Sequence, residues 1–296
     1  MTVLIDGKKV ADEIRGRIRD DVTLLKKKHG VVPGLAVVLV GDNPASVVYV
    51  RMKGKGCEEV GISSFQHKLK KETTEMELLE LIGELNRKKE VSGILVQLPL
   101  PSHINEKKVI NGISPGKDID GLHPVNVGKM TTGEDDGFIP CTPLGCQELI
   151  VRNAAPLKGK HLVIVGRSNL VGKPLANIMV QKNEKANCVV TVCHTAAPDI
   201  GYFTRQADIL VAAAGSPGMV TASMVKPGAV VIDVGTNRIE HPDDPGKSRL
   251  VGDVDFDGVK EVASAITPVP GGVGPMTITM LLKNTLKACM LQNGIF

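Results

Sequence analysis

A glycine-containing turn after an apolar run has the composition of a phosphate site. Residues 162–165 are β-branched or large and apolar, as expected for a strand covered on both faces. Gly166 then permits a sharp turn, while Gly172 and Pro174 suit the close packing and first turn of a following helix. The first turn of a helix carries unpaired N–H groups and partial positive charge, so the pattern indicates a cradle for a pyrophosphate.

The residues around this turn also bear on which dinucleotide would fit. The spacing of Gly166, Ser168 and Gly172 differs from the G-x-G-x-x-G fingerprint, so a buried strand and turn without a ligand is the alternative. NAD binders usually have an acid at the end of the second strand, where residues 193–195 read Cys-His-Thr. Arg167 adds a cation, which suits the extra phosphate of NADP better than NAD; a solvated loop charge is the alternative.

Three polar side chains in the first half of the chain are further candidates. Tyr49 and Lys53 are four residues apart in a segment expected to be helical, 44–59, and therefore share one face. A lysine on a helix is usually a solvated charge, and a lone tyrosine usually packs. Gln97 ends the apolar run 93–97, after which prolines halt the strand. It therefore lies at the strand edge where open α/β sheets bind ligands, unless it only bonds to a loop.

Two loops have an unusual composition. Residues 115–121 are rich in turn formers and carry carboxylates at positions 118 and 120, a pattern that Asx turns commonly explain. Residues 266–276 contain three prolines and three glycines among apolar residues. A flexible linker would hardly combine stiffness, close backbone approach and buried-type side chains. We interpret residues 266–276 as a rigid backbone loop that lines a site.

The elements that must position these residues alternate between helix and strand. Strands are expected over residues 34–41, 63–69 and 93–97 in the first half, and over 162–165, 188–193, 207–215 and 229–235 in the second. Helices are expected over residues 10–29, 44–59, 75–88, 140–150, 259–265 and 277–291, with a polar loop over 238–248 and an edge strand over 250–255. This order predicts an α/β fold whose second half is a doubly wound parallel sheet.

Composition excludes several classes of protein. The 296 residues suffice for two domains with separate cores, and a net charge of +4 with interspersed signs does not indicate nucleic-acid binding. The six cysteines include no C-x-x-C pair, which indicates reduced thiols in a reducing compartment and no metal site. The amino-terminal segment lacks signal-peptide character, and no run approaches a membrane span. We therefore expect a cytoplasmic protein without a membrane partner.

Five stretches together resemble one family, the methylenetetrahydrofolate dehydrogenase/methenyltetrahydrofolate cyclohydrolase enzymes. They are residues 46–53 (SVVYVRMK), 96–101 (VQLPLP), 117–121 (KDIDG), 166–174 (GRSNLVGKP) and 267–277 (TPVPGGVGPMT), in the family's order. The resemblance implies a folate-binding catalytic domain of residues 1–142 rejoined by the helix 277–296. It also implies a Rossmann-type NADP-binding domain of residues 143–276, a cleft between the domains, and a homodimer.

The resemblance further implies two consecutive reactions of one-carbon metabolism that serve purine biosynthesis. NADP takes a hydride from 5,10-methylenetetrahydrofolate to give the 5,10-methenyl form, and the protein orients the two rings. Hydrolysis to 10-formyltetrahydrofolate follows and needs proton transfers. One alternative is a dehydrogenase with weak cyclohydrolase activity and a preference for NAD. Another is a folate- or nucleotide-binding scaffold without turnover.

By the same resemblance, individual residues acquire roles. Lys53 is the proton-transfer group, with its pKa lowered by desolvation and its amine held by neutral Gln97. Tyr49 stacks on the folate, and Asp120 accepts hydrogen bonds from the pterin. The remaining folate contacts are Val96, Leu98, Pro270, Gly271, Gly272, Val273, Gly274 and Pro275. The NADP contacts are Gly166, Arg167, Ser168, Val171, Gly172, Thr195, Gly235 and Thr236, of which Thr195 and Thr236 replace a frequent serine and a frequent isoleucine.

Overall fold

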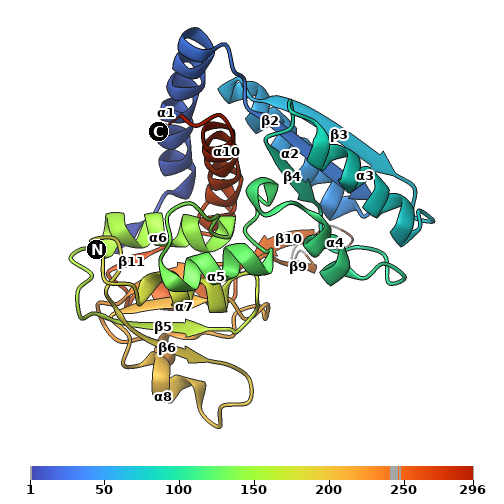
Figure 1. The fold of residues 1–296 in the computed structure, drawn as a ribbon. Coiled ribbons are helices and arrows are strands. Elements are labelled where there is room, and N and C mark those ends of the chain that lie inside the picture. The colour runs from blue at the N-terminus through green and yellow to red at the C-terminus, as the bar shows by residue number, and fades with distance from the viewer. Residues whose placement is uncertain (1, 241–245, 247, 296) are drawn as a thin grey trace. The chain divides into compact units, whose positions relative to one another are not determined.

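Two parallel sheets organise the chain in the computed structural model, which describes residues 2–240, 246 and 248–295 (Figure 1). Each sheet belongs to one of two compact units. Unit 1 comprises Met1–Ala11 and Thr142–Thr277, and unit 2 comprises Asp12–Cys141 and Ile278–Phe296. Residues 1–11 thus group with unit 1, whereas the resemblance placed them in the folate-binding domain. The reason is that strand β1 (Val3–Leu4) pairs with a strand of unit 1.

The sheet of unit 1 has the order β1-β11-β8-β7-β5-β6, and all its pairs are parallel. Its strands after β1 are β5 (His161–Val165), β6 (Val189–Cys193), β7 (Ile209–Ala212), β8 (Val230–Asp233) and β11 (Ala265–Ile266). If β5, β6, β7, β8 and β11 are numbered 1 to 5, their order across the sheet is 2-1-3-4-5. The chain therefore moves from β5 to one side, to β6, and then crosses to the other side, to β7, so the strand order reverses between β5 and β7. The predicted doubly wound fold is therefore confirmed.

The strands of unit 1 are apolar because the sheet is buried. The side chains of Val163, Leu210, Val231 and Ile266 lie in one core cluster, fully shielded from solvent. The helices of this unit are α6 (Cys141–Ala154), which starts at the last residue of unit 2, α7 (Gly172–Met179), α8 (Ile200–Thr204) and α9 (Phe256–Lys260). Helices α7, α8 and α9 lie between strands of the sheet, as parallel pairing requires, whereas α6 precedes β5.

The segment between β8 and α9 differs from the prediction. Strands β9 (Asn237–Glu240) and β10 (Ser248–Val251) form a separate antiparallel pair. The expected polar loop therefore contains a strand at its start. Strand β10, at the start of the expected edge strand, pairs with β9, and Val254 forms a single parallel bridge with Val220. The prolines at 242 and 245, on which the loop prediction rested, lie outside the described residues.

Unit 2 is built on a smaller parallel sheet of order β3-β2-β4. Its strands are β2 (Gly34–Val40), β3 (Ser63–Leu69) and β4 (Gly93–Val96), and its helices are α1 (Gly7–His29, from Asp12 on), α2 (Pro44–Val60), α3 (Glu75–Arg87), α4 (Glu106–Gly112) and α5 (Pro124–Thr132). A capping box between Thr74 and Glu77 starts α3, whose buried face includes Leu78 and Ile82. These side chains pack with β2 and β4 in one core cluster.

The final helix, α10, runs from Val273 to Gln292. It begins four residues earlier than predicted, because Pro275 lies in its first turn, where a helix needs no donor from that residue. Val273, Gly274 and Pro275 are therefore helical, and only residues 267–272 form the expected loop. Within the described part of the chain, no helix combines the length and apolar character that crossing a bilayer requires.

Candidate functional site

Helix α2 places Lys53 on the buried side of unit 2. The Asn43 side chain accepts hydrogen bonds from the backbone N–H groups of Ala45 and Ser46, which fixes the start of this helix. Lys53 follows on the inward face and is only 8% exposed. Its ammonium Nζ donates a hydrogen bond to Gln97 Oε1 at 2.8 Å. A buried amine bonded to a neutral amide is unusual for a surface-type residue, so Lys53 is not a solvated helix charge.

Gln97 is held in the orientation that this bond requires. Its backbone N–H donates to the carbonyl oxygen of Val38, which continues the β4–β2 ladder by one residue. Its side-chain Nε2 donates to the Leu98 carbonyl oxygen at 2.8 Å, so the amide oxygen faces Lys53. Gln97 therefore lies at the carboxyl end of β4, an edge strand of the parallel sheet of unit 2, and presents an acceptor there, as predicted from its position at a strand end.

Burial dominates the electrostatics of the amine. Desolvation lowers the pKa of Lys53, and the Asp120 carboxylate partly opposes this shift. Cys141 lies close enough to interact as well, but burial raises the pKa of its thiol well above the ordinary value. The thiol is therefore neutral near pH 7 and adds no negative charge. Lys53 is thus a lysine that can lose its proton more readily than a surface lysine.

Cys141 and Asn284 hold the backbone beside Asp120 and were not predicted from the sequence. The Cys141 side chain interacts electrostatically with Asp120, and its Sγ donates a hydrogen bond to the Ile119 carbonyl oxygen at 3.6 Å. From α10, Asn284 Nδ2 donates to the carbonyl oxygens of Ile119 at 2.8 Å and Ile139 at 3.0 Å. A buried asparagine among apolar helix residues was the available signal, because such a group needs partners.

The two carboxylates of the 115–121 loop have different tasks. Asp118 is buried and accepts hydrogen bonds from the backbone N–H groups of Leu122 and His123 and from Asn126 Nδ2. Burial raises the pKa of Asp118 to about 6. Asp118 therefore organises the loop through donors four, five and eight residues further on, which is not the two-residue bond of an Asx turn, whereas Asp120 is partly exposed beside Lys53.

Tyr49 lies one turn before Lys53 on α2 and is 37% exposed. Val48 and Met52, its neighbours along the helix, are each 44% exposed. The outer part of this helix therefore offers an aromatic ring and apolar side chains to a ligand, while the amine lies deeper. Val96 is buried in β4, and Leu98 is half-buried directly after Gln97.

In unit 1, the predicted phosphate residues lie together at the carboxyl ends of β5 and β6. Gly166 has a φ of +129°, and a Cβ at this position would overlap the Ala213 carbonyl oxygen in the loop after β7. Only glycine lets these two loops approach each other at the point where the strand order reverses. Ser168 Oγ accepts a hydrogen bond from Val171 N, which shapes the turn into α7 at Gly172.

The other predicted cofactor residues follow β5, β6 and β8, at the same carboxyl edge of the sheet. Arg167 is exposed on the loop after β5, and Thr195 is exposed two residues after β6. Gly235 and Thr236 follow β8, with Gly235 buried and Thr236 exposed. A cation and a hydroxyl beside the glycine turn, without an acid at the end of β6, fit a phosphate-bearing ribose.

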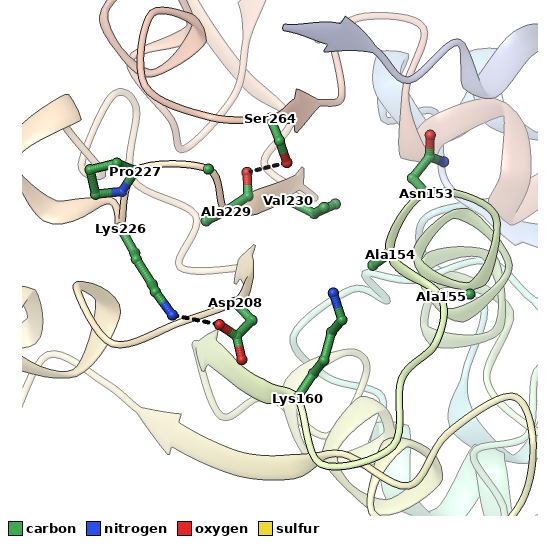
Figure 2. A pocket seen from close by; sticks show the side chains of 11 residues that line it. Asn153, Ala154, Ala155, Lys160, Asp208, Lys226, Pro227, Ala229, Val230 and Ser264 are labelled. Atoms are coloured by element: carbon green, nitrogen blue, oxygen red, sulfur yellow. Dashed lines mark hydrogen bonds and ion pairs between the residues drawn. The ribbon is translucent and has the colours of Figure 1, made fainter.

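The opposite edge of this sheet contains a pocket of about 330 Å³. Figure 2 shows its lining, which comes from the end of α6 and from residues at the amino ends of strands, including Lys160, Asp208, Val230 and Ser264. Asp208 accepts hydrogen bonds from Lys226 Nζ at 2.6 Å and from His161 N at 2.9 Å. The pocket is thus separated from the predicted cofactor residues by the length of the strands.

Two features of the described residues concern metals and thiols. No three His, Cys, Asp or Glu side chains in the described ranges are grouped as metal ligands would be. All six cysteines are buried free thiols. Burial raises the pKa of Cys57 and of Cys146 to about 12, so these thiols are poor nucleophiles.

Comparison with known proteins identifies the family. Residues 5–120 match the catalytic domain of tetrahydrofolate dehydrogenase/cyclohydrolase, and residues 140–293 match the NAD(P)-binding domain of the same family. The chain belongs to this family. The resemblance drawn from the five sequence stretches is therefore confirmed, and the family's catalytic and NAD(P)-binding domains are both present in one chain.

Relatives cover the chain almost completely. The bifunctional protein FolD of Prosthecochloris aestuarii is 58% identical over 97% of each chain, and that of Dehalococcoides mccartyi strain CBDB1 is 56% identical over 99% of this chain and 98% of its own. Among solved structures, the bifunctional enzyme FolD of Campylobacter jejuni is 46% identical with a TM-score of 0.93, covering 99% of this chain and 100% of its own. FolD of Trypanosoma brucei, solved with NADP cofactor and an inhibitor, is 40% identical with a TM-score of 0.93, covering 99% and 98%.

Proposed function

We propose that this chain carries out both reactions of its family. These are the NADP-dependent oxidation of 5,10-methylenetetrahydrofolate to the 5,10-methenyl form and the hydrolysis of that product to 10-formyltetrahydrofolate. The bifunctional relatives support this assignment across the whole length of the chain. The observation in this chain that carries it is the buried Lys53–Gln97 pair, because a dehydrogenase alone has no need of a desolvated amine.

For the hydrolysis, Lys53 is the proton-transfer group. Water adds to the methenyl carbon and must lose a proton, and the ring nitrogen that leaves must gain one. A neutral lysine amine near the substrate can accept the first proton and return it, because its lowered pKa makes both states accessible. Gln97 fixes the amine without adding a charge that would keep it protonated.

For folate binding, unit 2 supplies one hydrogen-bonding residue and several aromatic or apolar residues near the Lys53 amine. Asp120 accepts hydrogen bonds from the N–H groups of the pterin, since a carboxylate offers only acceptors. The exposed Tyr49 ring stacks on the planar ligand, and Val96 and Leu98 provide apolar contacts beside Gln97. The assignment of Pro270, Gly271, Gly272, Val273, Gly274 and Pro275 as folate contacts stays a prediction.

For cofactor binding, the residues of unit 1 fit a phosphorylated dinucleotide. Gly166 lets the loop after β5 pack against the Ala213 carbonyl, where a Cβ would not fit, and Ser168, Val171 and Gly172 shape the turn that would hold a pyrophosphate. Arg167 and Thr195 would hold the ribose phosphate, while Gly235 and Thr236 would lie near the nicotinamide half. When bound, NADP supplies the hydride acceptor. The solved relative with NADP supports this cofactor, and the alternative preference for NAD is not supported.

The direct test is an assay of purified protein with 5,10-methylenetetrahydrofolate and either NADP or NAD. We expect NADPH and methenyl absorbance to appear with NADP, and the methenyl band to decay in a step that needs no dinucleotide. Lys53→Met should lower the cyclohydrolase rate by about 10² to 10⁴-fold, the range of a lost acid–base group, with NADP binding unchanged. Lys55→Met, an exposed lysine of the same helix, is the matched control.

Unchanged methenyl hydrolysis by the Lys53 variant would contradict the role of this residue. Equal rates with NAD and NADP would contradict the cofactor assignment.

We also propose that the enzyme acts as a cytoplasmic homodimer and supplies one-carbon units for purine biosynthesis. The six free, buried cysteines support a reducing compartment. Light scattering of the purified chain, with a mass of 31.4 kDa per monomer, would test the assembly. A monomeric mass at working concentrations would contradict it.

A further inference from the structure

Two buried carboxylates lie at the carboxyl edge of the sheet in unit 1, and neither was a predicted site residue. Asp233 is the last residue of β8 and is 3% exposed, while Asp253 follows β10 and is fully buried. Their packing is tight, because a Cβ at Gly252 would overlap the Asp233 carboxylate and a Cβ at Gly235 would overlap Asp253. We call Asp233 and Asp253 the aspartate pair.

Asp253 joins the loops after two adjacent strands. Its Oδ2 accepts hydrogen bonds from Ala214 N at 2.7 Å and Gly215 N at 2.8 Å, and its Oδ1 accepts one from Ser216 N at 2.9 Å. Three consecutive N–H groups of the loop after β7 thus point at one carboxylate. Oδ1 also accepts a hydrogen bond from Asn237 Nδ2 at 2.8 Å, which ties in the segment after β8.

The Asp233 carboxylate in turn fixes the backbone at Asp253. It accepts hydrogen bonds from the backbone N–H groups of Gly235 at 2.9 Å, Asp253 at 2.9 Å and Val254 at 3.0 Å. The backbone N–H of Asp233 donates to Thr267 Oγ1 at 2.7 Å. The bonds therefore run from the sheet through Asp233 to Asp253, and from Asp253 to both loops.

These loops lie on the side of the sheet that the second half of a dinucleotide must use. The pyrophosphate is assigned to the loop after β5, and the phosphorylated ribose to the end of β6, which is the outer neighbour of β5. The other half of the cofactor must then extend over the ends of β7 and β8. The contact between Gly166 and the Ala213 carbonyl places the loop after β7 directly beside the glycine turn.

We propose that Asp253, held by Asp233, is a positioning residue that sets the loops after β7 and β8 in the conformation that receives the nicotinamide half of NADP. This inference rests on the proposed binding of NADP by unit 1. It assigns no contact with the cofactor to either carboxylate. The pair acts through the backbone of residues 214–216 and through residues 235–237.

The test is Asp253→Asn, which keeps the shape of the side chain but replaces one acceptor oxygen with an NH₂ group. Whichever way the amide turns, two of the four donors lose their acceptor. We expect the KM for NADP to rise about tenfold or more, as the loss of bonds to a charged group implies. The KM for the folate and the NADP-independent hydrolysis of the methenyl compound should remain unchanged.

Asp208→Asn is the matched control. Asp208 also accepts a backbone N–H and a side-chain donor in unit 1, but it lies at the amino edge of the sheet beside the pocket in Figure 2. We expect this variant to leave the KM for NADP unchanged. Asn237→Ala, which removes only the bond from the β8 side, should raise that KM by a smaller factor and serves if Asp253→Asn fails to fold.

The outcomes separate the possible roles. If the pair only stabilises the fold, Asp253→Asn lowers the amount of active enzyme, and hence kcat, but leaves the KM for NADP unchanged, which would overturn the proposal. An equal rise of this KM in Asp208→Asn would also overturn it. Failure of the proposed function would differ, because the wild-type protein itself would then show no NADP-dependent oxidation.

Discussion

At the scale of single residues, one neutral partner sets the chemistry of Lys53. Desolvation disfavours the ammonium form, and a carboxylate in the position of Gln97 would cancel that effect. The amide satisfies the hydrogen bond of the buried amine without contributing a charge. The acid nearby, Asp120, partly opposes the lowering of the Lys53 pKa.

This arrangement predicts the effect of Gln97→Glu. The new carboxylate would lie about where Oε1 now accepts from Lys53, so it would raise the pKa of the lysine. Because the proposed mechanism of hydrolysis uses the neutral amine, the pH at which the cyclohydrolase rate reaches half its maximum should move upward, and the rate at pH 7 should fall. The pH profile of methenyl hydrolysis measures this. Gln206→Glu, on the exposed surface of unit 1, is the control, and an unshifted profile for Gln97→Glu would contradict the role of the amide.

Residue types alone could not show which of the two carboxylates, Asp118 or Asp120, holds the loop and which faces Lys53. Both belong to one turn-rich loop, and only the fold shows that Asp118 points at three donors while Asp120 faces Lys53. The partners of Cys141 and Asn284 could not be predicted either, because they come from distant parts of the chain. In contrast, the position of Gln97 at a strand end and the shared helix face of Tyr49 and Lys53 were predictable, since they are local properties. Local pattern alone favoured a solvated Lys53, and only the family resemblance gave this residue a role in proton transfer.

At the scale of elements, Asp118 makes the stability of the 115–121 loop depend on pH. Its pKa is about 6 in the folded protein against an ordinary value of 3.8, so the folded state binds a proton more tightly than the unfolded state. This contribution to stability is fully present below pH 4 and is lost as the pH rises through 6. The protonated Asp118 side chain thus stabilises the folded state by about 3 kcal/mol at low pH, for a pKa difference of roughly two between the folded and unfolded states.

Urea unfolding of the wild type and of Asp118→Asn between pH 4 and 7 tests this expectation. The asparagine cannot titrate, so the unfolding free energy of the wild type minus that of the variant should fall across this range. Effects of other groups, including Asp233, cancel in the difference. A difference that stays constant with pH would show that burial does not shift the pKa of Asp118.

The glycine turn after β5 allows a prediction for a single element of unit 1. In Gly166→Ala, the new Cβ would overlap the Ala213 carbonyl oxygen, and the φ of +129° would be strained. The loop must therefore shift, and we expect the KM for NADP to rise about tenfold to hundredfold, as misplacement of a binding loop implies. Methenyl hydrolysis should be unaffected. Gly16→Ala, where nothing lies within 4 Å of the added Cβ, is the control. An unchanged KM in Gly166→Ala would contradict the assignment of this turn.

Elements were predictable where they are long and their burial is regular. The strands β2, β5 and β7 are buried on both faces, so their apolar runs identified them. Strands β1 and β11 have two residues each, too few for any periodic pattern. The start of α10 was misplaced because proline normally marks a loop, although the first turn of a helix accepts it.

At the scale of the whole molecule, the chain divides its tasks between two units that are each discontinuous in sequence. The residues assigned to proton transfer belong to unit 2, and those assigned to the dinucleotide belong to unit 1. Each unit has its own core cluster, with no member shared. NADP binding should therefore stabilise unit 1 more than unit 2.

The buried cysteines report this difference. Three of the six, Cys146, Cys188 and Cys193, belong to unit 1, and the other three, Cys57, Cys141 and Cys289, belong to unit 2. Because the thiols are buried, an alkylating reagent reaches them only when the surrounding structure opens. NADP at 100 times its Kd stabilises the bound state by about 2.7 kcal/mol, so it should slow labelling of the unit 1 cysteines about hundredfold.

Mass spectrometry of each cysteine peptide measures the labelling rates with and without NADP. The unit 2 cysteines should be slowed much less, because their core can open without releasing the cofactor; equal slowing of both sets would mean that the two units open as one.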